Sequence, residues 1–128
     1  MTTGPRLYGV NAVVADDMGV IRSALARILK LQGINVVGSA EDGREAVELC
    51  ELHRPELVFL DIRMSGYGGL DALRSIRALG LPTRVVMLTG EATMESVSEA
   101  FDAGADAYML KPFTLAQIIA TLKKLGFG

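Results

Sequence analysis

Acidic, hydroxyl and ammonium side chains stand directly after four short apolar runs of this 128-residue sequence. They are the carboxylates of Asp16, Asp17 and Asp61, the hydroxyl of Thr89 and the ammonium of Lys111. If the runs are parallel strands, all five groups lie at the carboxyl edge of one sheet, where ligands bind in α/β proteins. Crowded carboxylates repel one another and need a cation, and an oxygen-rich site with open positions suits Mg²⁺. A lysine beside them suits a phosphoryl oxygen, so the set predicts phosphoryl chemistry with magnesium.

Each of these residues also has an ordinary structural explanation. An acidic pair after a strand commonly caps a helix, a threonine at a strand end commonly bonds to nearby backbone, and Lys-Pro commonly forms a turn. The functional interpretation depends on where they occur together. The requirements of capping and turning do not by themselves place such a group at the end of each of four strands.

Five apolar runs have the length and the β-branched content of strands. Their continuous apolar character indicates strands that are covered on both faces, as in a parallel sheet. The runs are residues 10–15, 34–38, 57–60, 84–88 and 107–110.

Segments of helical periodicity separate the runs. Asp42, Thr93 and Thr114 are predicted N-caps of the second, fourth and fifth helices. In the fourth helix, Val97 and Phe101 are expected to face inward. The expected apolar stripe of the fifth helix is Leu115, Ile118, Ile119 and Leu122. Five strand–helix units in succession predict an α/β fold, a right-handed, doubly wound parallel sheet flanked by five helices.

Composition and charge narrow the class of protein. The chain has the length of one domain, residues 1–128. No apolar run approaches the ~20 residues that span a membrane, and residues 1–9 lack the apolar segment of a secretory signal. The net charge of −2 offers no basic surface for nucleic acid. A single cysteine, Cys50, suits a reducing compartment, and its neighbours Glu48 and Glu51 are expected to raise the pKa of its thiol. These features predict a cytoplasmic protein with no membrane partner and no direct nucleic-acid partner.

Four segments of the sequence resemble a known family. They are VVADD, LVFLDIRM followed by GGLDAL, VVMLTG and GADAYMLKPF. In this order they are similar to the response-regulator receiver domain, the CheY-like domain of two-component (His-Asp phosphorelay) signalling. The resemblance covers residues 10–125 and implies a single receiver domain with the flavodoxin-like strand order 2-1-3-4-5.

The resemblance implies a role for each site residue. Asp61 matches the phosphoacceptor, an aspartate that becomes an acyl phosphate. Asp17, an oxygen of Asp61 and the backbone carbonyl of Arg63 match the direct ligands of Mg²⁺, while Asp16 holds the metal indirectly or through water. Lys111 matches the lysine that pairs with the phosphoryl group, and the peptide bond between it and the following proline is commonly cis in this family.

The same resemblance implies a switch and partners. Thr89 matches a hydroxyl that moves to bond the phosphate, and Tyr108 an aromatic ring that then turns inward. The expected phosphoryl donor is a sensor histidine kinase or a histidine phosphotransfer protein, docking beside the turn that contains Met18 and Val20. The expected output is contact with a downstream effector protein through the fourth helix, fifth strand and fifth helix. The protein is therefore expected to be a signalling phosphoprotein that catalyses its own phosphorylation and dephosphorylation, and not an enzyme of metabolism.

Two departures from the family pattern bear on this site. Ser65 stands where the family often has proline, which predicts a looser loop after Asp61, although glycines 66, 68 and 69 remain for tight turns. Arg63 and Glu91 occupy the two positions that modulate the lifetime of the phosphate in the family. If they pair, they would shield an acyl phosphate from water.

The sequence leaves several interpretations of the function open. The leading one is a stand-alone receiver that signals by protein–protein contact, and the next is the receiver domain of a longer DNA-binding transcriptional regulator. A phosphatase of the haloacid dehalogenase type would carry its nucleophile in Asp-x-Asp after the first strand, whereas Asp16 and Asp17 are adjacent. A pseudoreceiver would not need the complete acid, hydroxyl and lysine set. The acidic stripe of Glu95, Glu99 and Asp102 is either solvated surface or a contact for a basic partner.

Overall fold

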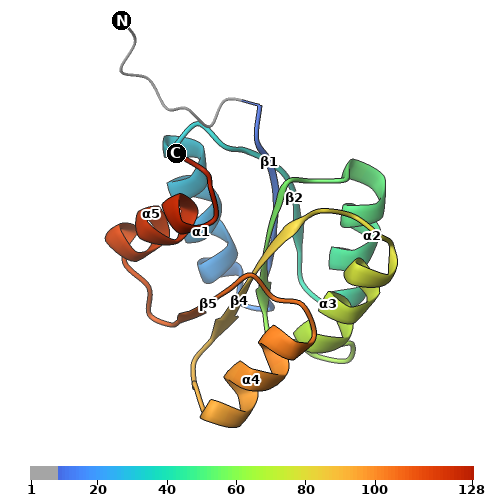
Figure 1. The fold of residues 1–128 in the computed structure, drawn as a ribbon. Coiled ribbons are helices and arrows are strands. Elements are labelled where there is room, and N and C mark those ends of the chain that lie inside the picture. The colour runs from blue at the N-terminus through green and yellow to red at the C-terminus, as the bar shows by residue number, and fades with distance from the viewer. Residues whose placement is uncertain (1–8) are drawn as a thin grey trace, which may run out of the picture.

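Five parallel strands form the centre of the computed structural model, which describes residues 9–128 (Figure 1). Their order is β2-β1-β3-β4-β5, which confirms the prediction. The strands and helices alternate as expected, and each strand begins and ends within two residues of its predicted bounds. The expectation that residues 1–9 form no secretory signal rests mostly on residues 1–8, which lie outside the described residues. The elements are β1 (Asn11–Ala15), α1 (Gly19–Leu31), β2 (Asn35–Ala40), α2 (Gly43–His53), β3 (Leu57–Asp61), α3 (Gly69–Ala78), β4 (Arg84–Thr89), α4 (Met94–Asp102), β5 (Ala107–Leu110) and α5 (Leu115–Lys124).

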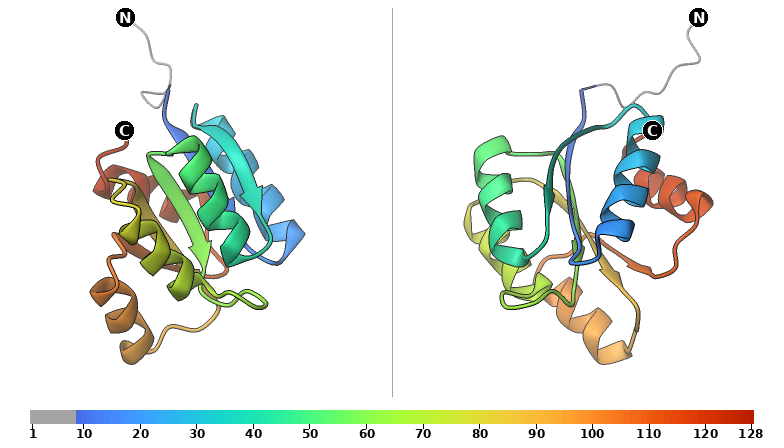
Figure 2. Two further views of the ribbon diagram at one scale, coloured as in Figure 1. Left: turned by 90° about the vertical axis from the view of Figure 1, so that its right-hand side faces the viewer. Right: turned by 180° about the vertical axis from the view of Figure 1, so that it is seen from behind.

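Helices cover both faces of the sheet (Figures 1 and 2). α1 and α5 pack on one face, and α2, α3 and α4 lie on the other. Side chains of β3 alternate between the faces with the period of two that a strand imposes. Val58 and Leu60 enter the core under α2 and α3, whereas Leu57 and Phe59 enter the core under α1 and α5. All four are fully buried, so β3 is packed on both sides. Within residues 9–128, none of the helices has the length and apolarity needed to cross a membrane.

The two edge strands are less covered than predicted. β2 has one buried residue, Ala40, and β5 ends in the half-exposed Leu110. The helices pack mainly over the middle of the sheet, so its edges keep part of their surface in solvent. The predictions for two helix positions are also wrong, because Phe101 and Leu115 are 45% and 48% exposed. In α4 it is Ala100 that faces the sheet, and Leu115 lies in the first turn of α5, before the helix meets the core.

Side-chain caps determine where three helices begin, as predicted. The carboxylate of Asp42 accepts a hydrogen bond from the backbone N–H three residues further on. The hydroxyls of Thr93 and Thr114 accept from the N–H groups of Ser96 and Gln117, whose side chains accept in turn from the backbone N–H of the capping residue. These reciprocal bonds satisfy N–H groups that have no partner inside the helix. α4 and α5 therefore begin at defined residues.

Cys50 lies in α2 and is fully buried. Burial raises the pKa of its thiol to about 12. The expected direction is confirmed, but the cause is loss of solvation and not the charges of Glu48 and Glu51. A buried thiol of this kind stays protonated and is inert.

Arg77, in the last turn of α3, joins several segments at the other end of the molecule from the acidic residues. Its guanidinium donates to the carbonyl oxygens of Thr83 (2.6 Å) and Gly104 (2.7 and 2.9 Å) and to the carboxylate of Asp106 (2.7 Å). The same carboxylate oxygen accepts from the N–H of Val85 at 2.8 Å. These bonds connect α3 with the segments that precede β4 and β5. The planar guanidinium holds its donors in fixed directions, which suits it to several acceptors at once.

Replacing Arg77 with alanine is expected to lower the free energy of unfolding by about 2 kcal/mol, because three partly buried acceptors lose their donor. Urea denaturation monitored by circular dichroism measures this difference. Arg27→Ala removes an exposed arginine from α1 and is the matched control, with an expected change within about 0.5 kcal/mol. Equal effects of the two substitutions would contradict a structural role for the Arg77 contacts.

Candidate functional site

The carboxyl ends of the parallel strands bring the predicted site residues to one edge of the sheet. Ala15, the last residue of β1, pairs with Leu60 of β3. Asp16 therefore lies beside Asp61, the last residue of β3. Thr89, the last residue of β4, is in register with the last residue of β5, which Lys111 follows. The predicted gathering of these groups is confirmed. The Lys111–Pro112 peptide bond is cis, as expected.

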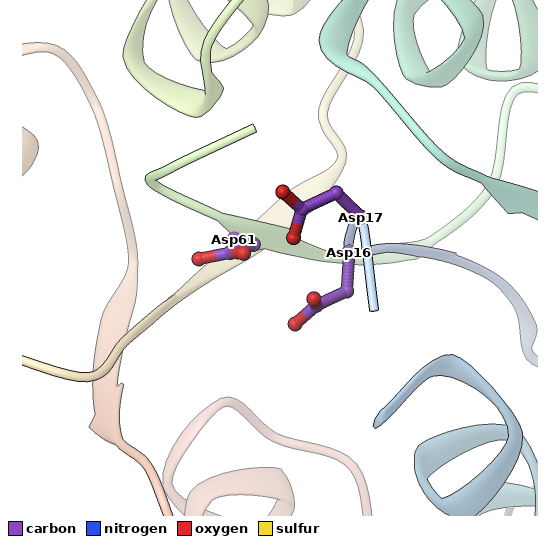
Figure 3. A group of neighbouring side chains, drawn as sticks. All are labelled: Asp16, Asp17 and Asp61. Carbon is purple, nitrogen blue, oxygen red and sulfur yellow. The ribbon is translucent and has the colours of Figure 1, made fainter. Parts of the chain in front are cut away.

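Three carboxylates meet at the ends of β1 and β3. Figure 3 shows the side chains of Asp16, Asp17 and Asp61 pointing toward a common space. One oxygen of each lies within 4.8 Å of an oxygen of each of the others. Asp16 and Asp61 are only 1% and 4% exposed, whereas Asp17 is exposed. The cluster is therefore shielded from water on one side and open on the other.

Burial and charge compete at Asp61. Loss of solvation raises the pKa of Asp61, and the neighbouring carboxylate of Asp16 raises it further, by more than Lys111 and the N–H of Arg63 lower it. The Nζ atom of Lys111 lies 3.3 Å from Oδ2 of Asp61 and 2.6 Å from Oδ2 of Asp16. Burial on its own would lower the pKa of Lys111, but the contacts with both carboxylates outweigh burial and raise it. The ammonium therefore stays charged and offsets part of the repulsion between the two acids.

Asp16 also organises the turn that follows β1. Its Oδ1 atom accepts from the N–H of Met18 at 2.9 Å, and its backbone carbonyl accepts from the guanidinium of Arg22 at 2.7 Å. Its Oδ2 atom lies 2.6 Å from Nζ of Lys111 and forms an ion pair with it. One ammonium leaves net negative charge on the three neighbouring carboxylates, and a bound cation would offset that charge. The set of donors therefore fits a hard cation such as Mg²⁺.

The loop between β3 and α3 lies against the end of β3. The N–H of Arg63 donates to Oδ1 of Asp61 at 3.2 Å, and the N–H of Gly69 donates to the carbonyl of Ile62 at 3.0 Å. Any side chain at Gly69 would collide with the carbonyl group of Asp61, so this close approach requires glycine. The backbone of Arg63 is thereby placed beside Asp61, at the position to which the family resemblance assigns a metal-binding carbonyl.

The two predicted switch residues bond to segments next to the acidic cluster. The buried hydroxyl of Thr89 donates to the carbonyl of Glu91 at 2.7 Å and accepts from the N–H of Glu91 at 3.1 Å. The hydroxyl of Tyr108 lies 3.1 Å from Oγ of Ser96, in the first turn of α4. The start of α4 and the loop before it are therefore attached to β4 and β5 through two hydroxyl groups.

Arg63 and Glu91 form the ion pair that the sequence suggested. Their guanidinium and carboxylate groups are 3.0 Å apart and join the loop after β3 to the loop after β4. The side chains are 78% and 63% exposed, so the pair contributes little to stability, about 0–1 kcal/mol. The pair matters for its place, because it connects the two loops that border the site.

Two contributors to the site were not predicted as such. Arg22, in α1, reaches the carbonyl of Asp16, but an arginine in an amphipathic helix gives no signal of this in the sequence, because such residues ordinarily face solvent. Gly69 was noted only as a residue for tight turns, whereas its role is to let α3 approach Asp61. Both features depend on which segments come together in the fold.

The sequence matches the family model of the response regulator receiver domain over residues 12–123. It is 40% identical over 126 residues to the transcriptional regulatory protein PdtaR of Mycobacterium tuberculosis, covering 94% of this chain and 61% of that protein. It is 36% identical over 127 residues to the probable transcriptional regulatory protein NarL of the same species, covering 98% of this chain and 59% of that protein. The chain thus spans about three fifths of the length of these relatives.

Solved structures resemble the whole fold. The signal receiver domain of the putative response regulator NarL from Mycobacterium tuberculosis superposes with a TM-score of 0.87 at 35% identity, covering 92% of this chain and 96% of that one. A chain of the CheX-CheY-BeF3-Mg complex from Borrelia burgdorferi superposes with a TM-score of 0.89 at 25% identity, covering 94% of this chain and 92% of that one.

Replacing Asp61 with asparagine is expected to raise the free energy of unfolding of the metal-free protein at neutral pH. The raised pKa means that the ionised form of Asp61 is disfavoured in the folded state, and asparagine removes that charge. As the pH falls through the folded-state pKa toward the ordinary value of 3.8, the native carboxyl becomes protonated and the advantage of asparagine fades. Urea denaturation with a chelator, repeated across this range, measures the effect. The control is Asp102→Asn at an exposed carboxylate of α4, and a similar gain there would contradict the explanation.

Proposed function

The chain belongs to the response regulator receiver domain family of two-component signalling, and we propose that Asp61 is its phosphoacceptor. The observation that carries this proposal is the buried carboxylate of Asp61, which lies beside a second buried carboxylate, Asp16, with the ammonium of Lys111 in contact with both. A nucleophile and a positive charge are thus held together at the edge of the sheet. Phosphoryl transfer needs little more than this positioning and neutralisation of charge.

The proposed reaction is transfer from a phosphohistidine of a sensor histidine kinase or a histidine phosphotransfer protein. A carboxylate oxygen of Asp61 attacks phosphorus, an O–P bond forms as the N–P bond breaks, and the histidine nitrogen keeps the electron pair. Lys111 places positive charge beside the group that is transferred. Attack by water on the acyl phosphate later releases phosphate and restores Asp61. Because the modified residue belongs to the protein itself, the domain acts as a signalling phosphoprotein and not as a multi-turnover enzyme.

We place Mg²⁺ at the same edge of the sheet. Asp17, Asp61 and the backbone carbonyl of Arg63 would hold it directly, and Asp16 indirectly or through a water molecule. When bound, Mg²⁺ neutralises the carboxylates and the phosphoryl oxygens. The support is the acidic cluster, whose negative charge the single ammonium of Lys111 does not balance. The residues of the chain itself orient the nucleophile, because the N–H of Arg63 holds one oxygen of Asp61 while Lys111 faces the other.

The proposed switch is the release of two hydroxyl groups. To reach a phosphoryl oxygen, the hydroxyl of Thr89 must leave both the carbonyl and the N–H of Glu91. The loop before α4 then loses two hydrogen bonds, and the ring of Tyr108 can turn only if its hydroxyl leaves Ser96. The phosphoryl group shifts this equilibrium by the difference between its interactions with the two states.

The output surface in this proposal is α4-β5-α5, which contacts a downstream effector protein. Phe101, Leu110 and Leu115 are exposed apolar side chains on these three elements. The phosphoryl donor would dock on the other side of the site, where Met18 and Val20 are exposed at the start of α1. Donor and effector then occupy different surfaces, in keeping with a cytoplasmic protein that signals by protein–protein contact.

A second candidate function is control of transcription as one domain of a longer regulator. The observation that favours it is the naming of the relatives PdtaR and NarL as transcriptional regulatory proteins, together with their greater length. In that case, the α4-β5-α5 surface would act on another part of the same polypeptide. The chemistry proposed at Asp61 is the same for both candidates.

Incubation with acetyl phosphate and Mg²⁺ is expected to attach one phosphoryl group to the protein. Intact-protein mass spectrometry detects the adduct, and hydroxylamine is expected to remove it because acyl phosphates are labile to this reagent. Asp61→Asn is expected to abolish the adduct, whereas the exposed control Asp102→Asn retains it. A chelator is expected to prevent its formation. An adduct that persists in Asp61→Asn would contradict the proposal, and so would the absence of any adduct in the unmodified protein.

Replacing Arg63 with alanine is expected to speed the loss of the phosphoryl group, because the ion pair with Glu91 no longer connects the loops over the site. An exposed pair worth about 0.5–1 kcal/mol corresponds to about a two- to fivefold change in rate. Decay of the phosphorylated protein is followed by mass spectrometry after the donor is removed.

The control for this experiment is Arg74→Ala. It breaks a comparable exposed pair between Arg74 and Glu99, 3.4 Å apart, that joins α3 to α4 away from the acidic cluster. It is expected to leave the decay rate unchanged. If Arg63→Ala also leaves the rate unchanged, the pair does not protect the phosphoryl group.

A further inference from the structure

Residues 62–68 connect β3 to α3 and contain few residues that restrict the backbone. Ser65 stands where the family often has proline, and Gly66 adopts a φ of +75°. Glycine and the lack of proline leave a chain with many accessible conformations, which must be lost when the loop becomes ordered. The loop carries the backbone of Arg63 next to Asp61, so its order matters at the site.

The backbone of Tyr67 anchors the outer part of this loop to α2. Its carbonyl oxygen accepts from the N–H of Gly43 at 2.9 Å. Gly43 is the first residue of α2, where N–H groups have no partner inside the helix. A side chain at Gly43 would collide with this carbonyl oxygen, so the contact exists only because position 43 is glycine.

The side chain of Tyr67 adds contacts to two helices. The guanidinium carbon of Arg44 in α2 lies 5.0 Å from the centre of the ring, within range of a cation–π interaction. The hydroxyl forms a hydrogen bond with Oγ of Ser75 in α3. The ring also packs against the core under α2 and α3, which lie side by side on one face of the sheet (Figure 2).

We propose that Tyr67 is a positioning residue for the magnesium and phosphoryl site, which it reaches through the loop that it holds. By attaching the loop to α2 and α3, Tyr67 supplies the restraint that proline would otherwise give and keeps the backbone carbonyl of Arg63 in one orientation. This proposal rests on the proposed function of Asp61 and Mg²⁺. Under this proposal, the contacts of Tyr67 offset the missing proline, so the loop is held more firmly than Ser65 alone predicts.

The test compares loop protection and metal affinity in three variants of the full chain. Tyr67→Ala removes the ring and the hydroxyl, and Ser75→Ala removes only the hydrogen-bond partner. Leu49→Ala is the matched control, because Leu49 packs from α2 against the same core but faces Gly38, away from the loop. Hydrogen exchange of residues 62–68 is measured on the metal-free protein, Mg²⁺ affinity by calorimetric titration, and stability by urea denaturation.

Tyr67→Ala is expected to speed exchange in the loop and to weaken Mg²⁺ binding about tenfold, as the loss of a residue that orients a metal ligand does. Ser75→Ala is expected to change both in the same direction by less, and it keeps the test valid if Tyr67→Ala does not fold. Leu49→Ala is expected to lower stability while leaving loop exchange and Mg²⁺ affinity unchanged.

Unchanged loop exchange and Mg²⁺ affinity in Tyr67→Ala and Ser75→Ala would overturn the inference. So would an equal loss of affinity in Leu49→Ala, which would make the effect one of general stability. If the unmodified protein binds no Mg²⁺, the metal part of the proposed function fails and the positioning role fails with it. Loop exchange then shows whether Tyr67 holds the loop at all. Faster exchange in Tyr67→Ala would mean that the contact holds the loop without serving a metal, and unchanged exchange would mean that it does not hold the loop.

Discussion

The repulsion between two buried carboxylates governs the site. Asp16 follows β1 and Asp61 is the last residue of β3, and these paired strands are buried on both faces of the sheet, so the two acids cannot easily move apart. Loss of solvation raises the pKa of Asp61 most and the carboxylate of Asp16 raises it further, and the ammonium of Lys111 offsets only part of the two effects. The preference for a cation at this edge therefore follows from the rigidity of the sheet as much as from the number of acids. The well-packed core under the site is what makes that rigidity possible.

The segments around the cluster are held far more weakly than the strands. Thr89 and Tyr108 attach the start of α4 by hydrogen bonds of hydroxyl groups, each worth about 1 kcal/mol net. A doubly charged group at Asp61 can compete with bonds of this size, whereas it could not displace β1 or β3. The fold thus separates a rigid part that holds charge from loops that can respond to it, and Tyr67 adds the β3–α3 loop to the rigid part.

The sequence predicted the features that depend on local pattern and on topology. Strand positions, the caps at Asp42, Thr93 and Thr114, and the gathering of acids at one edge follow from periodicity and from parallel strand order. The individual roles at the site came from the family resemblance and await experiment. The contacts of Arg22 and Tyr67 could not be foreseen, because they depend on how closely segments distant in sequence approach. Phe101 was misplaced because periodicity locates a stripe on a helix but not the angle at which the helix meets the sheet.

One residue, Glu91, takes part both in the contacts of the switch residue Thr89 and in the ion pair between the loops that border the site. Its backbone bonds to the hydroxyl of Thr89, and its carboxylate pairs with Arg63. Under the proposed function, Thr89 cannot be released without disturbing the residue that shields the phosphoryl group. The lifetime of the phosphoryl group and the conformation of the loop before α4 would then be linked through Glu91. An effector that bound the released loop would also change the lifetime of the phosphoryl group and hence the duration of its own stimulation, a form of feedback contained within one domain.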